Sequence, residues 1–175
     1  LQGFLWTTNI SRFYLNHYNN KEQMHNPPLI LITDDDSQLQ DLFATKLRAA
    51  DFTVIQAYNG KDGYEMAKKE NPDLILLDLK MPVMDGAETL AKLKSDPSTK
   101  NIKVIILSSF NDWSAMKMSS EAAQGMGALE FVEKGIDLNE LVGKVRLAVQ
   151  GVPEAGSVNP SAVSSESNSS QETSQ

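Results

Sequence analysis

The chain alternates short, almost continuously apolar runs with longer segments of helical periodicity. The apolar runs fall at 29–33, 52–57, 73–78, 102–107 and 128–132. Between them, apolar residues recur at i, i+3 and i+4, as on one face of an amphipathic helix. Strands that are apolar throughout are typical of a parallel sheet covered by helices on both faces. The pattern therefore predicts an α/β fold, a doubly wound five-stranded parallel sheet with five helices.

Two of the predicted helices have clear apolar faces and candidate N-terminal caps. The face of the first consists of Leu39, Leu42, Phe43 and Leu47, and that of the last of Leu138, Leu141, Val142, Val145 and Val149. Asp36 or Ser37 is expected to cap the first helix and Asp137 the last, because short polar side chains accept hydrogen bonds from first-turn N–H groups. Asn59-Gly60 and Asn71-Pro72 are turn signals beside the second helix.

Composition divides the chain into three parts. Residues 1–26 are an N-terminal extension that is expected to be poorly ordered, and their first part lacks the basic start and cleavage site of a signal peptide. Residues 27–150 form the predicted folded domain. Residues 151–175 contain eight Ser, three Glu and no Lys or Arg. Such a tail buries too little apolar surface to offset its ordering entropy, so it is predicted to be disordered.

Length and charge exclude several classes of protein. The 175 residues suffice for one domain with extensions, and the absence of cysteine excludes disulfides and thiolate metal sites. A net charge of -7 argues against a nucleic-acid surface, which needs clustered Lys and Arg. No apolar run reaches the ~18 residues that span a bilayer. We therefore expect a cytoplasmic protein without direct contacts to nucleic acid or membrane.

Polar residues with complementary chemistry follow four of the apolar runs. Asp34-Asp35-Asp36 follow the first, Asp78 ends the third, Ser108 follows the fourth and Lys134 lies just after the last. Right-handed crossovers bring these strand ends to one edge of the sheet, where open α/β sheets bind ligands. Carboxylates are the ligands that Mg²⁺ prefers, and an aspartate can accept a phosphoryl group. Lys and Ser are suited to hold phosphoryl oxygens.

Each of these residues also has an ordinary structural explanation when it is taken alone. Asp36 reads as a helix cap, and Asp34 or Asp35 as a cap or a solvated acid. Asp78 before a turn is structural more often than not, and Lys134 is by default a surface lysine. Their joint placement at successive strand ends is what favours a site for a divalent cation and a phosphoryl group.

Residues 29–150 resemble a response-regulator receiver domain, the phosphoacceptor module of two-component signalling, whose fold is flavodoxin-like. The resemblance rests on four segments, 30–36 (ILITDDD), 72–86 (PDLILLDLKMPVMDG), 105–109 (IILSS) and 131–134 (FVEK). It implies that Asp78 is the phosphorylated residue and that Asp34 and Asp35 form its acidic pocket.

The resemblance also implies a cofactor and further roles. The implied Mg²⁺ ligands are Asp35, Asp78, the backbone carbonyl of Lys80 and, through a water molecule, Asp34. The implied residues around the phosphoryl group are Lys134, which pairs with it, Ser108, the switch hydroxyl, and Phe131, the switch aromatic. Phosphorylation would draw Ser108 toward the new group and allow Phe131 to turn inward.

Three features depart from the family pattern. Gly135 stands where a proline usually follows the active-site lysine, often through a cis bond. Because a cis bond to a non-proline residue costs ~3 kcal/mol, a trans bond is expected here. The segment from Ser108 to Phe131 is longer than usual and is expected to extend the fourth helix or form a loop around Gly125-Met126-Gly127. The Lys80 side chain places a cation beside the phosphorylation site.

The sequence thus predicts a single-domain response regulator. It would accept a phosphoryl group from a histidine kinase or histidine phosphotransfer protein and contact a downstream protein through its fourth helix, fifth strand and fifth helix. Such a protein is a signalling phosphoacceptor rather than an enzyme, with Mg²⁺-dependent self-phosphorylation and self-dephosphorylation. The alternative is the receiver portion of a transcriptional regulator that lacks its output domain in this chain. A small-molecule phosphatase is disfavoured because no second acid lies near Asp78, and a pseudo-receiver because the acidic residues are present.

Overall fold

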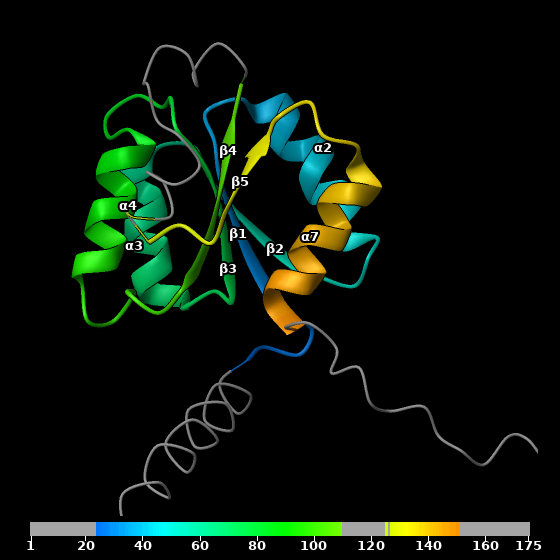
Figure 1. Ribbon diagram of the computed structural model, residues 1–175, viewed down its shortest axis with the longest axis horizontal. Helices are drawn as coiled ribbons and strands as arrows, with labels where there is room; N and C mark the ends of the chain where they lie inside the picture. Colours follow the sequence, from blue (N-terminus) through cyan, green and yellow to red (C-terminus); the bar gives the residue numbers. More distant parts are fainter. Residues whose placement is uncertain (1–23, 110–124, 126, 151–175) are drawn as a thin grey trace, which may run out of the picture.

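The computed structural model describes residues 24–109, 125 and 127–150. They form a parallel five-stranded sheet of order β2-β1-β3-β4-β5 with helices on both faces (Figure 1). The strands are β1 (Leu29–Thr33), β2 (Thr53–Ala57), β3 (Leu74–Asp78), β4 (Lys103–Ser108) and β5 (Glu130–Glu133). The helices within this part of the chain are α2 (Ser37–Arg48), α3 (Gly60–Glu70), α4 (Gly86–Ser95) and α7 (Leu138–Gln150). The predicted doubly wound fold is confirmed.

The predicted strand boundaries agree with the structure to within two residues. The largest difference is in the last strand, which was expected at 128–132 and runs from Glu130 to Glu133. The helix expected between β4 and β5, with its extra turn or loop, falls almost entirely on residues outside the described part. The same holds for residues 1–23 and 151–175. No helix in the described ranges is long and apolar enough to cross a membrane.

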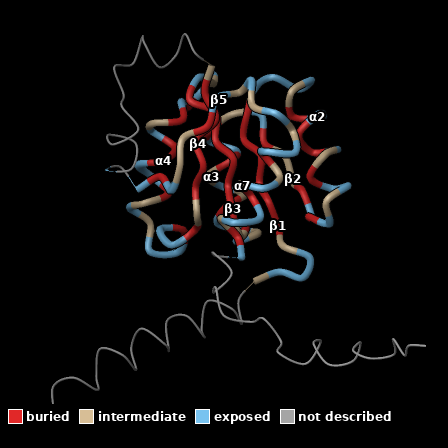
Figure 2. The backbone as a smooth tube through the Cα atoms, turned by 45° about the vertical axis from the view of Figure 1, so that its right-hand side comes forward, coloured by how far each residue is buried: buried red, intermediate tan, exposed pale blue. Residues whose placement is uncertain are grey.

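The core consists of two apolar layers, one on each side of the sheet. Ile30 and Ile32 of β1 pack with α2 and α7, whereas Leu31 between them packs with α3 and α4. All five residues of β1 and of β3 are buried (Figure 2). This two-sided burial explains why the strands are apolar without interruption, as parallel sheets covered on both faces require.

The buried face of α2 differs from the predicted one. Leu42 was placed on the apolar face, but its side chain is 49% exposed. The buried residues are Gln40, Phe43, Ala44 and Leu47, which have the i, i+3, i+4 and i+7 spacing of one helical face. Apolar periodicity alone did not reveal this face, because one of its four buried residues, Gln40, is polar. The last helix follows the prediction, with Leu141, Val145 and Val149 buried.

Side-chain caps begin the helices directly after the strand ends. Asp36 caps α2, because its Oδ1 accepts hydrogen bonds from the N–H groups of Gln38 (3.0 Å) and Leu39 (3.1 Å). Asp137 does the same for α7, as predicted, by accepting from Asn139 and Glu140. The turn from β1 into α2 therefore has little freedom, since both of its ends are held by hydrogen bonds.

The start of the described chain packs at the N-terminal ends of the strands, on the side of the sheet away from the strand C-termini. Met24 packs against the core on the α2 and α7 side. Asp73 Oδ2 accepts the N–H of Leu29 at 2.7 Å and lies 3.1 Å from His25 Nδ1. Met24 and His25 thus contact the domain. The start of the described chain and the end of α7 both lie at the end of the sheet far from the strand C-termini (Figure 1).

The loop from β3 to α4 requires a glycine at its end. A Cβ on Gly86 would lie 2.1 Å from the carbonyl oxygen of Asp78 and 2.7 Å from Leu79 Cα. The N–H of Gly86 donates to the carbonyl of Leu79 at 2.9 Å. The backbone of α4 therefore touches the end of β3 directly. Contact with backbone atoms leaves no side chain that could move aside.

We predict that Gly86→Ala lowers the free energy of unfolding by about 2 kcal/mol or more, because the added methyl group displaces the end of β3. The control is Gly143→Ala in α7, where an added Cβ meets no atom within 4 Å. That change should raise stability by about 0.5–1 kcal/mol, since Ala is favoured over Gly in helices. Urea unfolding followed by circular dichroism measures both. Equal effects would contradict the close contact.

Candidate functional site

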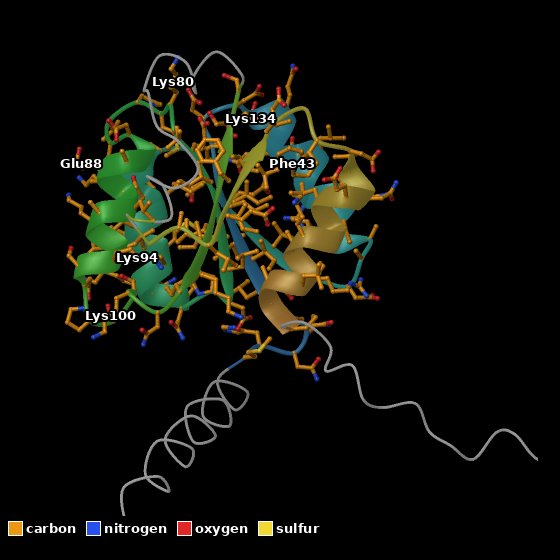
Figure 3. All side chains as sticks on the ribbon, in the orientation of Figure 1. Phe43, Lys80, Glu88, Lys94, Lys100 and Lys134 are labelled. Carbon is orange, nitrogen blue, oxygen red and sulfur yellow. The ribbon has the colours of Figure 1, made fainter. Side chains whose placement is uncertain are left out.

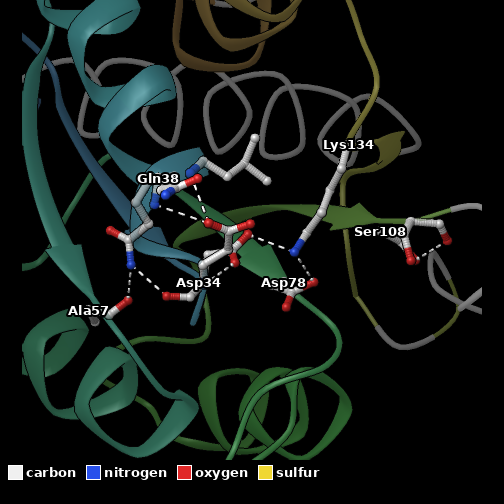
Figure 4. Close-up of polar contacts among 10 residues, drawn as sticks. Asp34, Gln38, Ala57, Asp78, Ser108 and Lys134 are labelled. Carbon is white, nitrogen blue, oxygen red and sulfur yellow. Dashed lines mark hydrogen bonds and ion pairs between the residues drawn. The ribbon is translucent and has the colours of Figure 1, made fainter.

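A buried ion-pair network joins three of the strand ends. Lys134 Nζ lies 2.8 Å from Asp34 Oδ2 and 2.9 Å from Asp78 Oδ1 (Figure 4). Asp34 and Asp78 are each 1% exposed. Asp34 follows β1 and Asp78 ends the neighbouring β3, whereas Lys134 follows β5, two positions further across the sheet. The long lysine side chain thus passes the end of β4, which is the small residue Ser108.

The backbone around Lys134 fixes the start of this long side chain. The N–H of Lys134 donates to the carbonyl of Ser108 at 2.8 Å, which continues the pairing of β4 with β5. Among the described residues only the Asn26–Pro27 bond is cis, so the bond from Lys134 to Gly135 is trans, as expected. Lys134 therefore reaches both carboxylates without a cis peptide bond beside it.

The carboxylates of Asp34, Asp35 and Asp78 form an acidic cluster. Oxygen atoms from the three residues lie within 4.8 Å of one another, and Asp35 is exposed whereas the other two are buried. Asp34 Oδ1 also accepts the N–H of Asp36 at 2.9 Å. An all-oxygen donor set with one solvent-facing member fits Mg²⁺, which binds one or two carboxylates and retains several waters.

Electrostatics within the site raise the pKa of Asp78 to about 6. Burial is the main cause, and the nearby charge of Asp34 adds to it, whereas Lys134 and the backbone N–H of Lys80 act in the opposite direction. Burial alone would lower the pKa of Lys134. Its hydrogen bonds to Asp34 and Asp78 and the negative charges of both carboxylates together outweigh that effect and hold its pKa above the ordinary lysine value. Lys134 is therefore a cation at neutral pH.

The other predicted site residues, Lys80, Ser108 and Phe131, lie on or shortly after β3, β4 and β5. Ser108 is fully buried, and its hydroxyl donates to the carbonyl of Ser109 at 3.2 Å. Phe131 is half-buried and packs against the apolar layer on the α3 and α4 side. The side chain of Lys80 is exposed and lies at the same end of the sheet as Lys134 (Figure 3). The switch roles of Ser108 and Phe131 and the carbonyl ligand from Lys80 stay predictions.

The loop after Asp78 contains a strained turn. Val83 has φ 71°, a value that a β-branched residue rarely adopts, and its side chain is 79% exposed. The N–H of Met84 donates to the carbonyl of Pro82 at 2.8 Å across it. The N–H of Gly60 in turn donates to the carbonyl of Met84 at 3.2 Å. This conformation persists because its neighbours hold the loop on both sides.

Sequence reasoning missed Gln40, which lies directly beneath the acidic turn. Its side chain is fully buried, and Nε2 donates to the carbonyls of Asp34 at 2.6 Å and Ala57 at 2.7 Å. A polar residue at the centre of a helix face that is otherwise apolar was the available signal. The predicted apolar face of this helix included Leu39 and Leu42 in place of Gln40 and Ala44, so Gln40 was not expected to be buried.

Comparison with known proteins identifies the class to which this fold and site belong. The chain matches the family of response regulator receiver domains over residues 30–146. Because this match covers more than half of the chain, the protein belongs to the receiver-domain family of two-component signalling. Receiver domains are the phosphoacceptors of these systems, as the sequence had indicated.

Relatives of known identity include both multidomain and small proteins. The chain is 36% identical to the DNA-binding dual master transcriptional regulator RpaA of Synechocystis over 68% of this chain and 48% of that protein. It is 35% identical to sporulation initiation phosphotransferase F of Bacillus subtilis, over 64% of this chain and 86% of the relative. It spans about half of RpaA and 25% of the response regulator PleD of Caulobacter vibrioides.

Solved structures of receiver domains share the fold. The CheY-like receiver domain protein of Methanospirillum hungatei has a TM-score of 0.61 and 25% identity, covering 70% of this chain and 94% of its own. The receiver domain of the Francisella response regulator 1452 has a TM-score of 0.62 and 25% identity, covering 70% of this chain and 97% of its own. The similarity thus extends over nearly the whole of these domains.

The raised pKa of Asp78 predicts a stability gain for Asp78→Asn in metal-free buffer. A carboxyl group whose pKa rises from 3.8 to about 6 on folding stabilises the fold fully below pH 3.8 and loses this contribution as pH rises through 6. Asn does not ionise, so the variant should be more stable above pH 6, on the order of 2 kcal/mol, and the difference should shrink toward pH 4. Urea unfolding at several pH values in EDTA measures this difference.

Asp51→Asn is the matched control, because Asp51 is exposed in a left-handed turn that Asn also tolerates. Its stability relative to the wild-type protein should change little between pH 4 and 8. A pH-independent gain in Asp78→Asn would show that the effect does not come from the Asp78 charge.

Proposed function

We propose that this protein is a single-domain response regulator that accepts a phosphoryl group on Asp78 from a histidine kinase or a histidine phosphotransfer protein. The observation that carries the proposal is the position of the Asp78 carboxylate at the end of β3, in contact with the Lys134 ammonium and clustered with the carboxylates of Asp34 and Asp35. Membership of the receiver-domain family supports the same assignment. A cytoplasmic location is part of the proposal.

The chemistry follows from the groups at the site. A carboxylate oxygen of Asp78 forms a bond to phosphorus while the bond from phosphorus to the donor imidazole nitrogen breaks. Lys134 keeps its proton and pairs with a phosphoryl oxygen, as an ammonium does. Asp34, Asp35 and Asp78, with the backbone carbonyl of Lys80, would hold Mg²⁺. The ion would supply positive charge against the carboxylates and the incoming phosphoryl group.

We predict that the wild-type protein gains one phosphoryl group when it is incubated with acetyl phosphate and Mg²⁺, and that Asp78→Asn abolishes this gain. Intact-mass spectrometry measures the added mass, and EDTA should suppress it. Asp51→Asn serves as the matched control, because it is the same chemical change at an exposed turn away from the site. Undiminished labelling of Asp78→Asn would refute the assignment of Asp78.

We favour a stand-alone regulator over the receiver portion of a transcriptional regulator. The relative that supports this preference is sporulation initiation phosphotransferase F, 86% of which is matched by this chain. RpaA, a DNA-binding transcriptional regulator by name, supports the alternative. The net charge of -7 argues against direct binding of nucleic acid by these residues. A mass well above 19.3 kDa for the protein isolated from its native cells would favour the alternative.

The described part of the proposed output surface consists of β5 and α7. A hollow of about 320 Å³ lies there, lined by Phe131, Val132, Glu133, Gly135, Ile136, Glu140 and Lys144. Leu129 just before β5 and Leu147 on α7 are both about half exposed. The helix expected before β5 completes this surface in the sequence prediction, but it lies outside the described residues. Exposed apolar side chains beside a hollow suit contact with a partner protein.

We predict that the phosphoryl mimic beryllofluoride, added with Mg²⁺, changes backbone chemical shifts in β5, at Lys134 and along α7. The physical reason is that a new anion at Asp78 draws Lys134 toward it, and Lys134 directly follows the strand that carries Phe131. Asp78→Asn should show none of these changes, which separates a site effect from unspecific binding. Changes restricted to the neighbours of Asp78 would contradict this output route.

A further inference from the structure

The side-chain amide of Gln40 bridges the ends of two strands beside the acidic cluster. Nε2 donates to the carbonyl of Ala57, the last residue of β2, at 2.7 Å and to the carbonyl of Asp34, just after β1, at 2.6 Å. Figure 4 draws both contacts at Ala57 and Asp34. The backbone N–H of Asp34 donates to the same Ala57 carbonyl at 3.1 Å. Gln40 thus extends the pairing of β1 with β2 by one residue.

The identity of the bonding atom follows from its partners. Both partners are backbone carbonyl oxygens, which only accept hydrogen bonds, so the atom between them must be the amide nitrogen with its two protons. The other atom of the group, Oε1, is buried and has no hydrogen-bond partner among the described residues. The group is therefore held in place by its two donated bonds.

These bonds hold Asp34, a residue whose backbone N–H, backbone carbonyl and carboxylate all have partners. The N–H and carbonyl of Asp34 are held by Ala57 and Gln40, and its carboxylate receives Asp36 N–H at 2.9 Å and Lys134 Nζ at 2.8 Å. Asp35, the exposed member of the acidic cluster, is the next residue in the chain. A change in the direction of the Asp34 carbonyl rotates the peptide unit that leads to Asp35.

We propose that Gln40 is a positioning residue for the metal site: its amide sets the backbone of Asp34 and thereby the arrangement of the Asp34 and Asp35 carboxylates relative to Asp78. The inference rests on the proposed function, since it concerns the same Mg²⁺ and phosphoryl site. In this proposal Gln40 contacts neither the Mg²⁺ ion nor the phosphoryl group. Residues that orient metal ligands in this way affect metal affinity although they bind no metal.

The test compares Gln40→Met with the wild-type protein. Met has nearly the length and shape of Gln and a similar helix propensity, but it has no N–H to donate. The matched control is Leu47→Met, which places the same residue at another fully buried position of α2, away from the acidic turn. Thermal unfolding of the three metal-free proteins separates general loss of stability from an effect on the site.

The first readout is the backbone amide signal of Asp36 in metal-free protein, because this N–H reports the position of Asp34 Oδ1. It should shift in Gln40→Met and stay in place in Leu47→Met. The second is Mg²⁺ affinity from an NMR titration, which should weaken about 10-fold in Gln40→Met. The rate of labelling by acetyl phosphate at subsaturating Mg²⁺ should fall with it.

Each outcome bears on a different claim. Failure of the wild-type protein to bind Mg²⁺ or to be labelled refutes the proposed function itself. Normal binding by wild type together with equal affinity in Gln40→Met overturns only the role of Gln40, as does an equal loss in Leu47→Met. If Gln40→Met does not fold, the role of Gln40 is tested by NMR on the wild-type protein. Its Gln40 amide protons should show scalar coupling to the Asp34 and Ala57 carbonyl carbons and should shift on Mg²⁺ addition, and absence of either overturns the proposal.

Discussion

The pairing of one buried lysine with two buried aspartates is the interaction on which this site depends. Two carboxylates that are 1% exposed at neighbouring strand ends repel each other and have lost hydration, and at Asp78 this raises the pKa. Lys134 counters these effects by placing its ammonium within 3 Å of each carboxylate. Loss of Lys134 would leave two buried carboxylates without their counter-ion, and an uncompensated buried charge typically costs about 3–5 kcal/mol. The charged state of the site is therefore a property of the three residues together.

The fold supplies what this interaction needs, namely strand ends at fixed separations. Parallel strands with right-handed crossovers bring their C-termini to one edge, and the sheet order places β1 beside β3 and β5 beyond β4. The Asp36 cap and the close contact of Gly86 with Asp78 leave short, well-held turns on either side. Precise placement at this edge of the sheet thus follows from the tight turns.

Much of this arrangement could be predicted from the sequence, because its signals are local. Unbroken apolar runs reveal strands buried on both faces, and polar residues directly after them locate the site edge. The face of α2 could not be predicted by the same rule, since the buried Gln40 is polar and the exposed Leu42 is apolar. The hydrogen bond from the Ser108 hydroxyl to the Ser109 carbonyl could not be predicted either, because the choice of acceptor leaves no pattern in the sequence. Apolar periodicity fails at positions such as Gln40, where a polar side chain is buried because its hydrogen bonds stabilise it there.

The charges at the site indicate why a metal ion is expected to precede the phosphoryl group. At neutral pH the three aspartates carry up to three negative charges, and Lys134 neutralises only one of them. An incoming phosphoryl group adds roughly -1.5 to -2 more and competes with Asp34 for Lys134. Without another cation, Asp34 would then be left buried and unpaired, which is the costly arrangement that the lysine now prevents. Asp34, Asp35 and Asp78 would hold a divalent ion, whose charge would compensate the carboxylates and leave Lys134 able to pair with phosphoryl oxygens.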